Sequence, residues 1–185
     1  MSGEPGRWRT FGTREIYRSP ELWLGQVDVE VAGGERIWEH VVRLHQAALM
    51  AVVDEQSRVL LVWRHRHVAD RWGWELPHGL VDEGEDAAEA ALHAVEDATG
   101  YRARQVEHLI TFRPLAETVD CEHVAFAGHD PERVGEGAAA SGAARVEWVP
   151  LGSVPGLIAE EQIWDAGTLV ALLRLLTLDG RSVPG

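Results

Sequence analysis

A polar loop that leads into a helix-forming segment, residues 79–101, is the feature that most constrains the fold of this 185-residue chain. Within it, apolar side chains recur at the spacing of one helix face, i, i+3, i+4 and i+7: Ala88, Ala91, Leu92 and Val95. This spacing predicts a helix from about Asp86 to Thr99 that buries one face, with Gly100 as its C-terminal stop. Because residues three and four apart share a helix face, the side chains at positions 94, 97 and 98 are expected to lie together.

Strand-type patterns flank this segment on both sides. Before it they predict two hairpins, one from residues 22–31 and 37–44 and one from residues 48–53 and 59–63, and a short strand at 73–77. After it they predict strands near residues 105–112, 122–127 and 145–149, a short helix near 157–161 and a longer helix at about 165–178. Hairpins followed by helices are typical of an α/β/α sandwich, in which helices cover both faces of a mixed sheet.

The spacing of residues 79–101 resembles the Nudix box, G-x5-E-x7-R-E-U-x-E-E-x-G-U, in which U is a bulky apolar residue. The positions that fall in register are Gly79, Glu85, Val95, Gly100 and Tyr101. The resemblance implies the Nudix fold, an α/β/α sandwich on a mixed β-sheet. In the family, the box holds Mg²⁺ or Mn²⁺ against a substrate diphosphate.

The flanking sequences are similar to those of the ADP-ribose pyrophosphatase group of this family. The similar segments are residues 40–43, 63–67, 72–77 and 163–173. The resemblance implies an N-terminal β-strand subdomain at residues 1–45, a Nudix domain at residues 46–180 and a tail at 181–185. It also implies a homodimer that pairs through the N-terminal strands, and substrates in which a nucleoside diphosphate is linked to another group.

The box differs from the family pattern at the positions that carry the chemistry. His93 stands where the family has Arg. The three helix positions that are carboxylates in the family are occupied here by Ala94, Asp97 and Ala98. One carboxylate remains, on a shorter side chain, whereas Mg²⁺ and Mn²⁺ prefer several oxygen ligands. We therefore expect a divalent metal site that is weak or absent.

The candidate catalytic residues are Glu85, His93, Asp97 and Glu117. Glu85 has an alternative role at the helix N-terminus, where a carboxylate satisfies free N–H groups, and Asp97 can simply be solvated. Glu117 lies in a loop with Asp120 and Glu122, where the resembling group often has its general base; a solvated acidic loop is the alternative. The candidate metal ligands are Asp97, Glu85, His93 and, more weakly, His78, whose imidazole could join His93 and Asp97 in a transition-metal site.

The candidate ligand-binding residues are Arg43, Arg64, Arg66, Trp38, Trp74 and Gly79. The arginines are candidates for phosphate contacts, and the alternative is pairing with some of the 30 acidic residues. The two tryptophans are candidates for stacking on a nucleotide base. Packing in the core is the alternative for either tryptophan.

The composition excludes several classes of partner. The net charge of −13 argues against nucleic acid and anionic membranes as partners, and no apolar run reaches the roughly 18 residues of a membrane span. Cys121 is the only cysteine, so an internal disulfide is excluded. The first six residues lack a signal-peptide pattern, so we expect a cytoplasmic protein with a small-molecule partner.

Three functions are compatible with the sequence. The first is a pseudoenzyme or repurposed pocket that binds a nucleoside-diphosphate-like ligand. The second is an active but atypical diphosphohydrolase, in which Glu85, Asp97 and loop acids hold one metal ion. The third is an interaction protein whose dimer surface matters most, which the eight tryptophans and the N-terminal hairpin permit.

Overall fold

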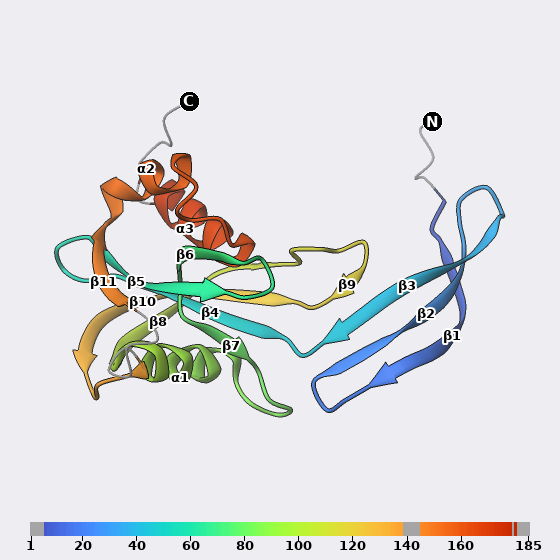
Figure 1. The fold of residues 1–185 in the computed structure, drawn as a ribbon, viewed down its shortest axis with the longest axis horizontal. Coiled ribbons are helices and arrows are strands. Elements are labelled where there is room, and N and C mark those ends of the chain that lie inside the picture. Colours follow the sequence, from blue (N-terminus) through green and yellow to red (C-terminus); the bar gives the residue numbers. More distant parts are fainter. Residues whose placement is uncertain (1–5, 139–144, 179, 181–185) are drawn as a thin grey trace. The chain divides into compact units, whose positions relative to one another are not determined.

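The computed structural model describes residues 6–138, 145–178 and 180, so the tail expected at residues 181–185 lies outside the described residues. By their contacts the residues form two compact units. One contains Met1–His45 and Leu115–Cys121, and the other contains Gln46–Pro114 and Glu122–Gly185. The segment 115–121, which sequence patterns place in the second domain, thus belongs with the N-terminal strands. Figure 1 shows the elements of both units.

The N-terminal unit is a four-stranded sheet in the order β1-β2-β3-β9. Its strands are β1 (Arg9–Arg18), β2 (Leu22–Glu30), β3 (Arg36–Leu44) and β9 (Val119–Asp120). The hairpin expected from residues 22–31 and 37–44 is confirmed as β2 and β3, which pair antiparallel. Alternate residues of β2 are buried, and Trp23, Val27 and Val29 form a small core with Ile37 and Val41 of β3.

The larger unit contains two sheets, in the orders β7-β4-β10-β8 and β11-β5-β6. The strands of the first sheet are β4 (Ala47–Val52), β7 (His78–Leu80), β8 (Tyr101–Phe112) and β10 (His123–Arg133). The strands of the second sheet are β5 (Arg58–Arg66), β6 (Arg71–Glu75) and β11 (Arg145–Pro150). The helices are α1 (Ala87–Thr99), α2 (Val154–Ala159) and α3 (Ala166–Leu178), with a 3-10 turn, η2, at Leu151–Ser153. The first sheet is mixed, because β4 and β10 run parallel and its other pairs are antiparallel.

Strand β4 lies at the centre of the sandwich and is buried along its whole length. Successive side chains of a strand point to opposite faces, and β4 accordingly contributes Met50 to the core under α1 and Leu49 to the core under α3. Val95 of α1 and Leu172 of α3 lie in these two cores. Figure 1 shows α1 on one side of the strands of this unit and α2 and α3 on the other. The expected α/β/α sandwich is confirmed. No helix in the described part of the chain is long and apolar enough to cross a membrane.

Helix α1 begins and ends at the predicted residues. The side chain of Asp86 caps its N-terminus by accepting hydrogen bonds from the backbone N–H groups of Ala88 and Glu89. Gly100 ends it in the left-handed conformation, with φ of 76°. Because Asp86 caps the helix, Glu85 does not have the alternative role of accepting hydrogen bonds from the helix N–H groups. Its side chain accepts a hydrogen bond from the backbone N–H of Asp82 instead.

Candidate functional site

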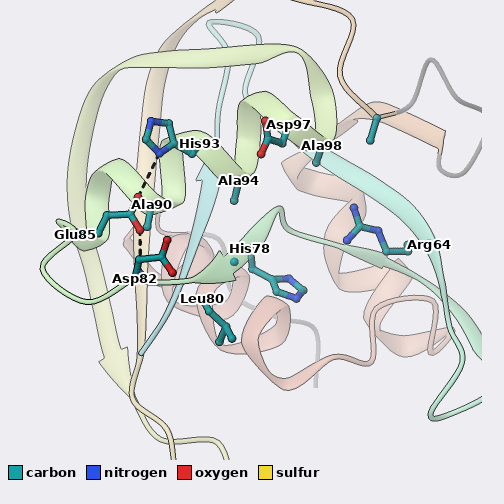
Figure 2. Close-up of a pocket in the computed structure, with 12 residues that line it drawn as sticks. Arg64, His78, Leu80, Asp82, Glu85, Ala90, His93, Ala94, Asp97 and Ala98 are labelled. Carbon is teal, nitrogen blue, oxygen red and sulfur yellow. Dashed lines mark hydrogen bonds and ion pairs between the residues drawn. The ribbon is translucent and has the colours of Figure 1, made fainter. Parts of the chain in front are cut away.

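A cavity of about 430 Å³ lies between β7 and one face of α1. Six of the residues that the sequence singles out line it: Arg64, His78, Gly79, Glu85, His93 and Asp97. Figure 2 shows all of these side chains except that of Gly79, which has none. Ala94 and Ala98 also line it, so positions 94, 97 and 98 share one helix face as expected. This cavity is the candidate active site.

Glu85 and His93 form a pair at one side of this pocket (Figure 2). The Nδ1 atom of His93 lies 3.3 Å from Oε1 of Glu85, and Oε2 of Glu85 accepts a hydrogen bond of 3.0 Å from the backbone N–H of Asp82. The carboxylate is therefore held from two directions. The sequence contains one signal for this pair, because an imidazole can still donate a hydrogen bond where the box pattern has a guanidinium.

His78 cannot serve as the metal ligand considered above, because both of its ring nitrogens are engaged. Its Nδ1 lies 3.1 Å from the carbonyl oxygen of Leu76, and its Nε2 lies 3.0 Å from Nη2 of Arg66. A carbonyl only accepts and a guanidinium only donates. This network therefore assigns the proton to Nδ1 and gives the lone pair of Nε2 to Arg66. A metal ion at Nε2 would displace the guanidinium, so the expected site of His78, His93 and Asp97 is not formed.

Arg66 is paired with Glu75 through two of its three guanidinium nitrogens. Its Nε lies 2.9 Å from both carboxylate oxygens, and its Nη2 lies 2.5 Å from Oε2. Glu75 is 3% exposed, whereas the side chain of Arg66 is 33% exposed, so the carboxylate is buried and the guanidinium still reaches water. The hydrogen bond to Glu75 raises the pKa of Arg66 above its ordinary value. The sequence signal for this pair was a carboxylate in a strand between the apolar residues Trp74 and Leu76.

Arg64 lies two residues earlier on β5 and, unlike Arg66, is not paired with an acidic residue of the described ranges. It is half-buried and lines the pocket, and its guanidinium makes no hydrogen bond or ion pair with any other residue in the described ranges. Figure 2 shows its guanidinium on the side of the pocket opposite Glu85. A guanidinium in this position is suited to a phosphate or carboxylate of a ligand. The expectation of a phosphate contact on this strand therefore fits Arg64 better than Arg66, and the ligand-binding role of both residues stays a prediction.

Comparison with known proteins agrees with this architecture. The NUDIX domain model matches residues 43–172, which is most of the chain. The chain belongs to the Nudix family. The match spans β4 to α3 and therefore includes every residue that lines the pocket.

Several characterised Nudix relatives are similar to this chain. It is 41% identical over 180 residues to the CMP-5'-(N-acetyl-N-hydroxy-3-aminopropyl)phosphonate hydrolase of Streptomyces rubellomurinus, covering 97% of this chain and 87% of that protein. It is 25% identical over 104 residues to the ADP-ribose pyrophosphatase of Bacillus subtilis, covering 56% of each. The crystal structure of an ADP compounds hydrolase superposes with a TM-score of 0.81 over 98% of this chain and 100% of that one, at 17% identity. This last likeness supports the fold.

Nudix hydrolases generally use divalent metals, but the pocket residues of this chain do not fit such an ion. Two of the three helix positions are Ala94 and Ala98, and Asp97 is exposed and makes no ion pair with the described residues. No group of three or more His, Cys, Asp or Glu side chains within residues 6–138, 145–178 and 180 could hold a metal. Mg²⁺ and Mn²⁺ prefer octahedral sets of oxygen ligands, which this donor set does not supply.

The remaining candidates are not among the residues that line this Nudix pocket. Trp74 is 4% exposed and packs against Trp63 at a centroid distance of 5.2 Å, so its expected role in base stacking is replaced by core packing. Arg43 lies over the ring of Trp23 at 4.4 Å in the N-terminal unit. Trp38 and Glu117 both line a hollow of that same unit. The ligand-binding roles of Arg43 and Trp38 and the catalytic role of Glu117 stay predictions.

Proposed function

We propose that this protein hydrolyses a phosphoanhydride that joins a nucleoside monophosphate to a second phosphoryl or phosphonyl group. The observation that carries the proposal is the 41% identity, along nearly the whole chain, to a hydrolase of a CMP-linked phosphonate. The preserved pocket supports it, because an unpaired arginine faces a glutamate–histidine pair there. A cavity of about 430 Å³ is within the usual size range for a small-molecule site.

Arg64 is the residue that we assign to the anionic phosphorus group. It is a half-buried cation whose ligand can replace water without breaking an existing ion pair. Substitution of Arg64 by Ala should therefore weaken binding of the substrate more than it destabilises the fold.

A second candidate function is ligand binding without turnover. The observation that favours it is the presence of Ala94 and Ala98 in the pocket wall where the family has carboxylates. In this case the pocket would bind a nucleotide-like ligand but would release it unchanged.

A substrate panel separates the two candidates. We expect the purified protein to release CMP from a synthetic anhydride of CMP and methylphosphonate, measured by chromatography of the nucleotide and by phosphorus NMR. Binding of this compound in calorimetry, without release of CMP under any condition, would instead establish the second candidate.

With ADP-ribose and Mg²⁺ we expect little or no hydrolysis. Groups that act as a catalytic unit lose several orders of magnitude in rate when one member is removed, and here two box carboxylates are replaced by alanine. Turnover of ADP-ribose at about 1 per second or faster, the usual enzyme range, would contradict the assignment of an atypical site.

We further propose that the N-terminal unit mediates a homodimer. Its strand β1 is the edge of the sheet and exposes Phe11, Ile16 and Tyr17, each at least 50% exposed. Such an edge with apolar side chains favours pairing with another chain.

Light scattering should give twice the 20.4-kDa chain mass, and the double variant F11D/I16D should be monomeric. The control V68D, at a 90% exposed position of the other unit, should stay dimeric; a monomeric parent protein would refute the proposal.

A further inference from the structure

We propose that Glu85 and His93 form the general-base unit of the proposed hydrolysis, in place of the carboxylate set that the helix lacks. The inference rests on the proposed function and assigns its proton acceptor. It starts from the one contact that joins two titratable side chains of the pocket, the 3.3 Å approach of His93 Nδ1 to Glu85 Oε1.

The pair fixes which nitrogen of His93 is available. A carboxylate only accepts hydrogen bonds, so Nδ1 donates its proton to Glu85. The lone pair of the neutral ring is then on Nε2, which has no partner among the described residues. The His93 side chain is 59% exposed, so water reaches this nitrogen. An imidazole held in one tautomer by a carboxylate is the arrangement that general-base catalysis requires.

The loop holds the orienting carboxylate in place. Glu85 is 25% exposed, and its second oxygen accepts the backbone N–H of Asp82 at 3.0 Å. Asp97 lies one helical turn after His93 and lines the same pocket. Arg64 lines the same pocket, at the opposite end from Glu85 and His93 (Figure 2).

The step is a hydrolysis that consumes one water. The water oxygen forms a bond to the phosphorus of the nucleoside monophosphate, and the water proton passes to Nε2 of His93. The bond from this phosphorus to the bridging oxygen breaks, and its electron pair leaves with the departing phosphonate. His93 then returns the proton to solvent, and the products are the nucleoside monophosphate and the free phosphonate.

The test compares the full-length protein with H93A, E85Q, E85A and the control H67A, using the CMP–methylphosphonate anhydride in EDTA. We expect H93A to lower kcat by about 100-fold or more, with a small change in KM. Added imidazole should restore part of this rate, because it fits the space left by the deleted ring. H67A removes an exposed histidine outside the pocket and should keep the parental rate. E85Q keeps an oxygen that can accept from Nδ1, so it should lose less activity than E85A.

Three results would overturn the inference. One is an H93A protein with the parental kcat, which would leave the proposed function standing. Another is a folded H93A protein, verified by circular dichroism, whose lost rate imidazole does not restore. The third is the absence of CMP release by the parent protein with or without Mn²⁺, which would overturn the proposed function as well.

Discussion

The variant H93R/A94E/D97E/A98E should bind Mn²⁺ about 100-fold more tightly than the parent protein and should gain measurable cleavage of ADP-ribose. The physical reason is that positions 94, 97 and 98 line one pocket on one face of α1, so three glutamates there present their oxygens to a common point. Glu and Arg are good helix formers, so α1 should tolerate the changes. The variant exchanges the proposed histidine base for the metal-binding arrangement of the family.

Titration calorimetry with Mn²⁺ and release of AMP from ADP-ribose measure the two gains. The matched control H93R/A94Q/D97Q/A98Q has the same side-chain lengths without the charges and should gain neither. Metal binding without cleavage would show that the substrate pocket has diverged as well. A folded variant without any metal binding would show that the assignment of this helix face is wrong.

The substitution Glu75→Ala should lower the free energy of unfolding by about 3 kcal/mol. Glu75 is 3% exposed and accepts hydrogen bonds from both Nε and Nη2 of Arg66. Its removal leaves the half-buried guanidinium of Arg66 without its counter-charge and leaves a cavity where the buried carboxylate was. Because Arg66 also donates to His78, the ring that borders the pocket should lose its fixed orientation.

Urea unfolding followed by circular dichroism measures this loss. The matched control is Glu161→Ala, which breaks the pair between Arg71 and Glu161 at 3.1 Å. The side chain of Glu161 is 76% exposed, so this change should cost under about 1 kcal/mol. Equal costs for the two substitutions would contradict the account of Glu75 as a buried partner.

The sandwich could be predicted from the sequence because local patterns mark its elements, and the position of the pocket followed from the resemblance to the Nudix box. The 3.6-residue period of α1, the stop at Gly100 and the alternation in β2 are properties of short segments. The shared face of positions 94, 97 and 98 follows from helix geometry alone. The structure therefore agrees with the prediction at these points.

The roles of individual polar residues could not be predicted, because they depend on contacts between distant segments. Arg64 and Arg66 lie two residues apart on one strand. They differ because Glu75 of β6 pairs with Arg66, whereas the guanidinium of Arg64 has no partner among the described residues. The contacts with Arg66 and with the carbonyl oxygen of Leu76 determine which ring nitrogen of His78 carries the proton. The burial of Trp74 depends in the same way on its packing against Trp63 of the neighbouring strand.

We propose that this protein hydrolyses its substrate without a divalent metal ion. The most direct test is the rate of CMP release from the CMP–methylphosphonate anhydride after divalent metals have been removed from the protein with EDTA. The donor set around Asp97 does not fit Mg²⁺ or Mn²⁺, whereas Glu85 and His93 supply a base. Hydrolysis should therefore continue in EDTA, and added Mn²⁺ should change kcat by less than about 10-fold. Hydrolysis that stops in EDTA and returns in full with Mn²⁺ would contradict this proposal.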